Sequence, residues 1–249
     1  DSRKMGFYKK FWVLDGKNNI YPTQYKGLNQ VMFMNYYCVW GKEKGKVNDS
    51  WDSVEENYNT KIINTGSVYL SSLKKWKKSE IDVNNMTLLY PSGPLRDYMA
   101  CLEEITPEKN FAHKINITKL LKRLLQKYSG LKVLYKTFPG IDSCNDPFME
   151  ILSEELDQGR VKRTSKHPVK LMRVVDIVLF DMISTGFAEA VKIGTPTLVY
   201  NNEFDYELAS DEGKKINDKF ENCGMVFYDT ESGIKSFERI VNDLPTFQE

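Results

Sequence analysis

Several features that point to common protein classes are absent from this chain of 249 residues. No apolar run approaches the roughly 20 residues needed to cross a bilayer. The formal net charge of +1 provides no strong field for nucleic acid or an anionic membrane. The first ten residues, DSRKMGFYKK, contain no signal-peptide core and do not begin with Met. We therefore expect a cytoplasmic protein that binds no nucleic acid, and a chain excised from a longer one.

Metal-binding and disulfide patterns are also missing. No C-x-x-C pair and no histidine cluster accompanies the four separated cysteines, Cys38, Cys101, Cys144 and Cys223. This spacing argues against a zinc site and fits reduced thiols. The two histidines, His113 and His167, are isolated, and polar loop positions are favoured over a catalytic role. His167 precedes Pro168 and is expected to open a helix. We predict no metal site.

What is present is a regular alternation of strands and helices after residue 86, which predicts an α/β fold with a Rossmann-like, doubly wound parallel sheet. The expected strands are Thr87–Tyr90, Lys132–Lys136, Arg160–Arg163, Ile177–Phe180, Thr197–Tyr200 and Met225–Tyr228. The expected helices are Asp97–Ile105, Ile117–Tyr128, Phe148–Leu156, Val169–Val175, Ser184–Ile193, Glu207–Asn222 and Gly233–Asp243.

The first 80 residues differ from the rest in composition and pattern. All four tryptophans lie here, and the strand-like pieces are short: Lys10–Leu14, Val31–Tyr37 and Lys61–Asn64. The polar stretch Ser72–Asn85 is typical of a linker. Its KKWKK run is either a solvated linker or helix face, or a contact for anionic lipid or a phosphorylated carrier. We predict a partial N-terminal domain with its linker at 1–80 and a nucleotide-donor-binding domain at 81–249.

The segment Val174–Asn201 indicates function most clearly. Ile177–Phe180 and Thr197–Tyr200 are buried strands joined by the DMISTG turn and a short helix, which is a parallel βαβ crossover. Gly194 is a natural helix C-terminal residue. In such sheets, ligands bind beyond the carboxyl ends of the strands, and this turn, Asp181–Gly186, is expected there.

The chemistry of this turn suits a phosphate and a ribose. Ser184 and Thr185 are N-cap residues, and free N–H groups at the helix start attract an anion. Glu189 lies four residues after Thr185, on the same side, where a carboxylate accepts hydrogen bonds from a ribose diol. The alternative is capping alone, although a capping box would place Glu three residues after the cap. A side chain at Gly186 is expected to clash with the bound phosphate.

This segment resembles the donor-binding motif of GT-B-fold glycosyltransferases, especially bacterial surface-carbohydrate and polyol-phosphate (CDP-glycerol type) transferases. Those proteins carry a strand, D-x-x-S-[ST], a helix with Glu and a G-x-P strand. The matching positions are Asp181, Ser184, Thr185, Glu189, Gly194 and Pro196. The resemblance implies that the Ser-Thr turn contacts the diphosphate and that Glu189 contacts the ribose.

Three other stretches resemble the same families in the same order. MTLLYPSG, Met86–Gly93, is similar to the first strand of the C-terminal domain, whose glycine turn approaches the donor. LKVLYKTFPG, Leu131–Gly140, is similar to a K-x-H-P element, with Lys136 and Pro139 matching. Phe138 replaces the histidine, and a phenyl ring cannot donate to a phosphate. YCVWG and IINTGSVY resemble the last strands of the N-terminal domain.

A GT-B enzyme places its active site between two Rossmann-like domains, and this chain contains one complete domain. The resemblance therefore implies the donor-binding half of a transferase in surface polysaccharide biosynthesis. It uses a nucleotide-activated sugar or polyol donor and a glycan or lipid-linked acceptor, with possible contact to the inner face of the membrane. No cofactor is implied, and the absence of a D-x-D motif fits. Lys136 would offset charge on the leaving nucleotide, or is a solvated strand-end lysine.

The predicted donor-binding residues are Ser92, Gly93, Lys136, Asp181, Ser184, Thr185, Gly186 and Glu189, which we expect to line one cleft. The catalytic residues are not identified by the sequence. Two other classes remain open: a non-catalytic nucleotide-binding module, and a regulatory or interaction domain in which Asp181 is only a strand-end acid. A receiver domain is disfavoured because residues 86–92 carry no acidic pair.

Overall fold

The computed structural model describes residues 36–39, 61–64, 66–75, 80–93, 106–138, 146–203 and 211–243. The chain divides into two compact units, one of residues 1–73 with 206–218 and the other of residues 74–205 with 219–249. The division predicted after residue 80 stays a prediction. The predicted strand Lys10–Leu14, the helix Asp97–Ile105 and all four tryptophans lie outside the described residues.

The described part of the first unit includes a small parallel sheet. Strand β1 (Tyr36–Val39) pairs with β2 (Lys61–Asn64), so Lys61–Asn64 is a strand as predicted. The short helix α4 (Val68–Ser72) follows, and the Ser67 hydroxyl accepts a hydrogen bond from the Leu70 N–H at 3.0 Å.

The second unit is built on a six-stranded sheet in the order β5-β4-β3-β6-β7-β8. All five pairings between neighbouring strands are parallel. The strands are β3 (Thr87–Pro91), β4 (Lys132–Lys136), β5 (Val161–Arg163), β6 (Ile177–Phe180), β7 (Thr197–Tyr200) and β8 (Val226–Phe227). The predicted doubly wound α/β fold is confirmed. The strand order reverses between β3 and β6, which is where such sheets bind ligands.

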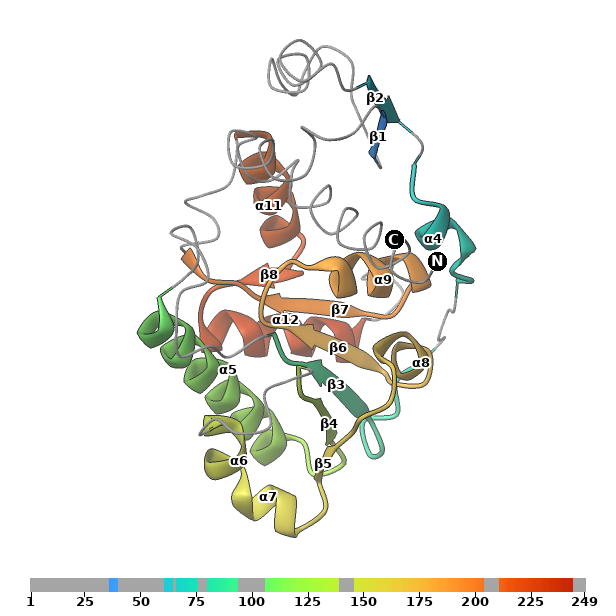
Figure 1. Cartoon of the computed structure of the whole chain (residues 1–249). Coiled ribbons are helices and arrows are strands. Elements are labelled where there is room, and N and C mark those ends of the chain that lie inside the picture. The colour runs from blue at the N-terminus through green and yellow to red at the C-terminus, as the bar shows by residue number, and fades with distance from the viewer. Residues whose placement is uncertain are drawn as a thin grey trace. The chain divides into compact units, whose positions relative to one another are not determined.

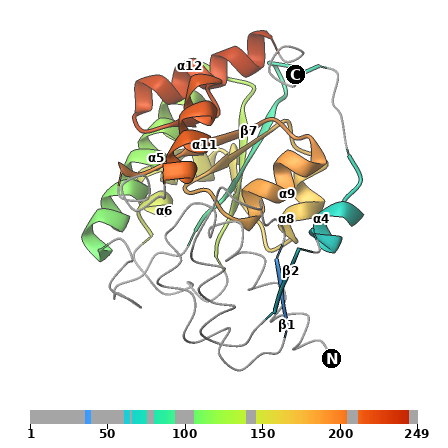
Figure 2. The same cartoon turned by 90° about the horizontal axis from the view of Figure 1, so that it is seen from above.

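Helices cover both faces of this sheet (Figure 1). They are α5 (Pro107–Lys127), α6 (Pro147–Ile151), α7 (Ser153–Asp157), α8 (Pro168–Met172), α9 (Thr185–Ile193) and α12 (Thr230–Asn242). Helix α11 (Asp211–Asn222) belongs to the first unit up to residue 218 and to the second unit from residue 219. Figure 2 shows α5, α6 and α12 on one side and α8 and α9 on the other. Among the described helices, none combines the length and apolarity that crossing a bilayer requires.

Helix α5 starts at Pro107 rather than at the predicted Ile117. Its start has a cap, because the Thr106 hydroxyl accepts from the Lys109 N–H, and proline at the first position needs no N–H partner. The first turns carry polar residues, so apolar periodicity does not reveal them. The apolar stripe of this helix packs in the same core cluster as the sheet and is fully buried at Ile117, Leu120, Leu121, Leu124 and Leu125.

Other helix boundaries also differ from prediction. The single helix expected at Phe148–Leu156 is two, α6 and α7, separated at Leu152, whose ψ of 24° is not helical. Helix α8 ends at Met172 instead of Val175, and His167 opens it as predicted, its Nδ1 accepting from the Val169 N–H at 3.3 Å. Helix α12 begins at Thr230 because the Asp229 carboxylate caps it.

The β6–α9–β7 crossover forms at the predicted residues. Val178, Leu179 and Phe180 of β6 pair with β7 in parallel register, and all of β6 is buried. Helix α9 ends at Gly194, whose φ of 90° is in the left-handed region that glycine adopts freely. The crossover therefore carries the predicted turn to the carboxyl edge of the sheet.

Candidate functional site

The carboxyl edge of the sheet at the switch point brings together the ends of β3, β4 and β6. The turn Ser92–Gly93 follows β3, Lys136 ends β4, and Asp181 follows β6 directly. The Ser92 N–H donates to the Lys136 carbonyl at 2.9 Å, which fixes the β3 turn against β4. These predicted residues therefore share one edge of one sheet.

Asp181 lies beneath the β3 turn and is 4% exposed. Its Oδ2 accepts from the Gly93 N–H at 2.7 Å and from the Tyr90 hydroxyl at 3.2 Å, and it forms an ion pair with Lys114. A Cβ at position 93 would lie 2.9 Å from Asp181 Oδ1. Glycine is therefore required at position 93 for this close approach of backbone to carboxylate.

Lys114 reaches this carboxylate from α5, and its side chain is 7% exposed. Besides Asp181, its Nζ contacts Ser92 Oγ at 2.7 Å, the Gly93 carbonyl at 3.0 Å and the Tyr90 hydroxyl at 3.3 Å. An ammonium has three protons to donate, so these acceptors fully occupy it. Lys114 thus joins α5 and the ends of β3 and β6 through one buried charge.

The buried groups of this network shift one another's pKa values. Burial by itself raises the pKa of Asp181, but the Lys114 ammonium, helped by the Gly93 N–H, outweighs it and holds that pKa below its ordinary value. Burial, reinforced by the Asp181 charge, raises the pKa of Tyr90 well above its ordinary value. At neutral pH the network consequently contains an ionised Asp181 carboxylate and a neutral Tyr90 phenol.

His113 is also part of this edge, not a loop residue as predicted. It lies on α5, and its Nε2 is 2.9 Å from the Asp181 carbonyl oxygen, so the ring N–H donates there. Its ring also meets Tyr200 of β7 edge-on at 5.4 Å between centroids. The sequence prediction failed because α5 extends further toward its N-terminus than the apolar stripe.

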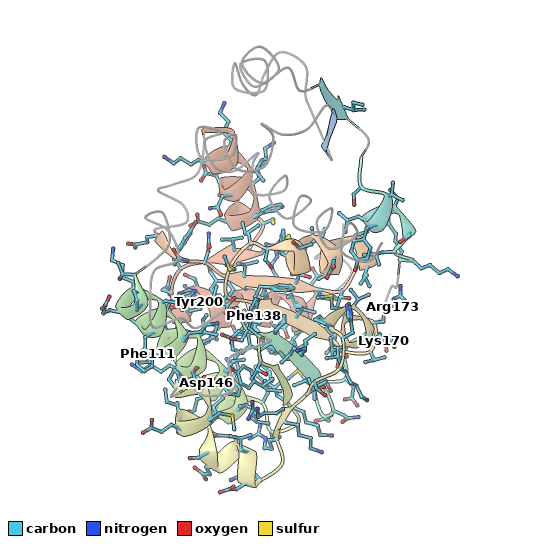
Figure 3. The ribbon with its side chains drawn as sticks, in the orientation of Figure 1. Phe111, Phe138, Asp146, Lys170, Arg173 and Tyr200 are labelled. Atoms are coloured by element: carbon cyan, nitrogen blue, oxygen red, sulfur yellow. The ribbon has the colours of Figure 1, made fainter. Side chains whose placement is uncertain are left out.

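A small pocket opens beside the network on the α5 and α6 side. It is open to solvent, has room for about one water molecule, and is lined by Ser92, Gly93, Lys114, Tyr135, Thr137, Phe138 and Asp146. The Tyr135 hydroxyl donates to Asp146 Oδ2, and the Tyr135 ring stacks on Phe148 at 3.8 Å. Burial, then the Asp146 hydrogen bond, raises the pKa of Tyr135 above its ordinary value. In Figure 3, Phe111 and Asp146 lie toward α5, while Lys170 of α8 and Arg173, which follows that helix, lie on the other side of the view.

The start of helix α9 lacks a side-chain cap. Ser184 occupies the N-cap position with extended backbone, but its side chain makes no capping hydrogen bond. The first intrahelical bond runs from the Ala188 N–H to the Ser184 carbonyl at 3.3 Å. In the described part of the chain, the buried Thr185 hydroxyl has no hydrogen-bond partner. Side-chain capping by Ser184 therefore does not account for this turn. One turn further on, Glu189 is 6% exposed.

Gly186 has a packing role that the sequence did not reveal. A Cβ at this position would lie 2.9 Å from Cε1 of Phe180, whose ring is buried. The expected clash of a larger residue therefore occurs first with Phe180, inside the protein. Substitution at Gly186 tests packing before it tests phosphate binding.

The fold and this edge can be compared with known proteins. The family model described as LIC12162 family transferase matches residues 17–246. The chain belongs to the LIC12162 family of transferases. This membership confirms the predicted resemblance to a transferase family with a GT-B-like fold. A comparison with curated proteins gives no match.

Solved structures share the fold of this chain at low identity. The UDP-GlcNAc 2-epimerase from Neisseria meningitidis bound to UDP-GlcNAc is 19% identical, with a TM-score of 0.50 over 80% of this chain and 53% of that one. The S. aureus MnaA–UDP co-structure is 14% identical, with a TM-score of 0.47 over 82% and 48%. The chain thus spans about half the length of these structures.

Only some of the predicted donor residues of this chain line the pocket. Ser92 and Gly93 do, and Asp181 lies directly beneath them. Lys136 donates to the Thr137 carbonyl at 3.0 Å. Neither Lys136 nor the turn Ser184–Gly186 is among the pocket residues that the structure describes. That all of these residues line one cleft stays a prediction.

Sequence reasoning missed Lys114, Tyr135 and Asp146. Lys114 was detectable, because extending the apolar stripe of α5 backwards from Leu121 by seven residues reaches it. Asp146 precedes Pro147 and has the signature of a helix N-cap, which it is: its Oδ1 accepts from the Phe148 N–H at 3.0 Å. No pattern in the sequence indicates the hydrogen bond between Tyr135 and Asp146.

Proposed function

We propose that this chain is the donor-binding half of a transferase that moves a sugar or a polyol phosphate from a nucleotide-activated donor to a glycan or lipid-linked acceptor. The process is surface polysaccharide biosynthesis, in the cytoplasm at the inner face of the membrane. Membership of a transferase family supports the reaction class. The switch point between β3 and β6 supports the place of binding.

The lack of a side-chain cap at the start of α9 is the observation that carries this proposal. The backbone N–H groups of Thr185, Gly186 and Phe187 precede the first intrahelical donor, so the helix does not satisfy them. The Thr185 hydroxyl beside them is buried and without a hydrogen-bond partner in the described part of the chain. A diphosphate supplies acceptors for both, and the helix dipole favours its charge.

Glu189 and Lys136 complete the donor site in this proposal. Glu189 projects from the same side of α9 as Thr185, one turn on, where its carboxylate accepts from the ribose diol. Lys136 ends β4 at the same edge and offsets charge as the nucleotide leaves. Lys114 is not a phosphate ligand, because the network occupies its ammonium.

Calorimetric titration of UDP, GDP and CDP against the purified chain tests the proposal. We expect one nucleoside diphosphate to bind, and Glu189→Ala to weaken that binding by about 1.5–3 kcal/mol, the scale of hydrogen bonds to a charged group. Glu154→Ala, which removes an exposed carboxylate from α7, serves as the matched control and should bind like the parent. Melting curves confirm that each variant stays folded.

Two results would count against the donor site: no nucleoside diphosphate binds, or folded Glu189→Ala binds as tightly as the parent. A nucleotide-binding module without catalysis is the alternative. Only a transferase releases nucleotide when donor and acceptor are supplied together, so release measured with the full-length protein separates the two.

A further inference from the structure

We propose that the outer surface of the α8 and α9 layer is a docking surface for an anionic lipid bilayer. This inference deepens the proposed function and rests on it for the partner, because a lipid-linked acceptor is held in a membrane. It names the part of the molecule that meets the lipid. We call this surface the basic face and define it by Lys162, Lys166, Lys170, Arg173 and Lys192.

The charge of residues 158–202, all of which the structure describes, is one-sided. The basic residues of this stretch are Arg160, Lys162, Arg163, Lys166, Lys170, Arg173 and Lys192. Its acidic residues are Asp176, Asp181 and Glu189, and each of them is buried. Every lysine of the stretch is exposed, so its surface carries cations and no exposed carboxylate. In a chain of net charge +1, positive charge is thus concentrated locally.

The cations of the basic face are not neutralised by ion pairs. On the opposite side of the sheet, Arg123 and Lys127 of α5 pair with Glu231 and Glu238 of α12. Within the described part of the chain, no ion pair involves a cation of the basic face. Its charge therefore stays available to an anionic surface, whereas the charge on α5 is balanced by α12.

These cations lie on one side of the sheet. Val161 of β5 belongs to the core cluster that includes the α5 stripe, so Lys162, the next residue of the strand, lies on the opposite side. Helices α8 and α9 cover that side (Figure 2) and pack against each other. Lys170 and Lys192 belong to these two helices, and Figure 3 shows Lys170 and Arg173 together beside α8. The strand, the helices and the residues that follow them therefore form one basic surface.

The apolar residues of this surface favour a bilayer over nucleic acid. Val174, which follows Arg173, is 71% exposed, and Val191, which precedes Lys192, is 46% exposed. Apolar side chains among cations enter the boundary between lipid headgroups and acyl chains, whereas single-stranded nucleic acid binds exposed aromatic rings. The aromatic residues of 158–202 are all buried: Phe180, Phe187 and Tyr200. Lipid headgroups are therefore the better match for this surface.

The loop after β5 links the basic face to the candidate site. Thr164 follows β5 at the carboxyl edge of the sheet, and its N–H donates to the Tyr135 carbonyl of β4 at 2.9 Å. Lys166 lies in the same loop, and α9 starts at the same edge. A bilayer against the basic face would thus lie beside the proposed donor site, where a lipid-linked acceptor is required.

Co-sedimentation of the full chain with lipid vesicles, in the absence of nucleotide, tests the proposal. We expect binding to vesicles of equal parts phosphatidylcholine and phosphatidylglycerol, and none to phosphatidylcholine alone. Raising the salt from about 0.1 M to about 1 M should abolish this binding, because the screening length falls from about 10 Å to about 3 Å. A triple variant, Lys162→Gln with Lys166→Gln and Lys170→Gln, should bind about tenfold more weakly or worse.

A charge-matched triple variant separates the basic face from the total charge. Lys109→Gln with Lys119→Gln and Lys235→Gln removes the same charge from exposed positions on α5 and α12 and should bind like the parent. Melting curves check that both variants stay folded. The basic face is overturned if the parent does not bind the anionic vesicles, or if the two triple variants bind equally.

Two further outcomes are decisive. A DNA duplex that binds the parent more tightly than vesicles of equal phosphate concentration would overturn the lipid partner. The nucleotide titration is separate from the vesicle assay: a chain that binds vesicles through the basic face but no nucleoside diphosphate overturns the proposed function alone, and a chain that binds the diphosphate but no anionic vesicle overturns the basic face alone.

Discussion

At the scale of single residues, the Lys114–Asp181 pair is the feature on which the candidate site depends most. Removing one partner of a buried ion pair leaves the other charge without compensation in a medium of low polarity. Here the remaining charge would lie under the Ser92–Gly93 turn, so the cost includes the geometry of the pocket. The network is therefore a positioning device for the β3 turn as well as a source of stability.

Lys114→Met tests this role. We expect the free energy of unfolding to fall by about 3–5 kcal/mol, because Asp181 would stay buried without its cation. Urea denaturation followed by circular dichroism measures the change. Lys127→Met is the control on the same helix: Lys127 pairs with Glu238 at the surface, and its loss should leave the urea midpoint unchanged. Equal midpoints for the two variants would show that Lys114 contributes no more to the free energy of unfolding than a surface lysine does.

At the scale of elements, β6 and α9 form the unit that presents the donor turn. A central parallel strand is covered on both faces, so its side chains are apolar without alternation. Ile177 and Leu179 contribute to the core cluster that includes the α5 stripe. Val178 is also fully buried, and residues alternate between the two faces of a strand. The strand and its turn should therefore keep their geometry only when both layers pack.

Val178→Asp is expected to prevent stable folding. Val178 has 0% exposure, and an unpaired carboxylate there would lose its hydration without gaining a partner. Val174→Asp, a few residues earlier and 71% exposed, is the control and should melt like the parent. The measurement is thermal unfolding of soluble protein. A cooperative Val178→Asp transition near the parental temperature would contradict the two-sided burial of β6.

At the scale of the whole molecule, the network makes stability depend on pH. The pKa of Asp181 is below its ordinary value in the native state, and close to 3.9 in the unfolded chain. As pH falls, the unfolded chain takes up this proton first. The stabilisation from Asp181 is thus complete above about pH 4 and is lost below it, toward the lowered native pKa.

Urea midpoints measured between neutral pH and about pH 3 check this linkage. We expect a nearly constant midpoint down to about pH 5 and a fall below about pH 4. Asp181→Asn should unfold at lower urea at neutral pH and show a shallower acid fall. Asp82→Asn, whose carboxylate makes an exposed turn contact, should follow the parent. Parallel acid curves for the parent and Asp181→Asn would disprove the contribution of Asp181.

The sequence by itself determined the strands, the parallel crossover and the fold class. These depend on local patterns: runs of apolar residues such as Ile177–Phe180, and residues that end a helix, such as Gly194. It also placed Ser92, Lys136 and Asp181 on one edge, because carboxyl ends of parallel strands meet there. It misplaced the start of α5 and the break at Leu152, where polar turns and a non-helical residue leave no periodic signal.

Only the tertiary structure decided which groups meet. Lys114 and Asp181 are 67 residues apart in the chain, and their contact depends on how α5 lies across the sheet. Tyr135 meets Asp146 for a similar reason, since α6 must pack beside α5 before its cap reaches β4. Periodicity records which side of an element is buried, but not its neighbour. Pairing is set by the packing of whole elements, so the pocket and its charge network emerge only when the layers are assembled.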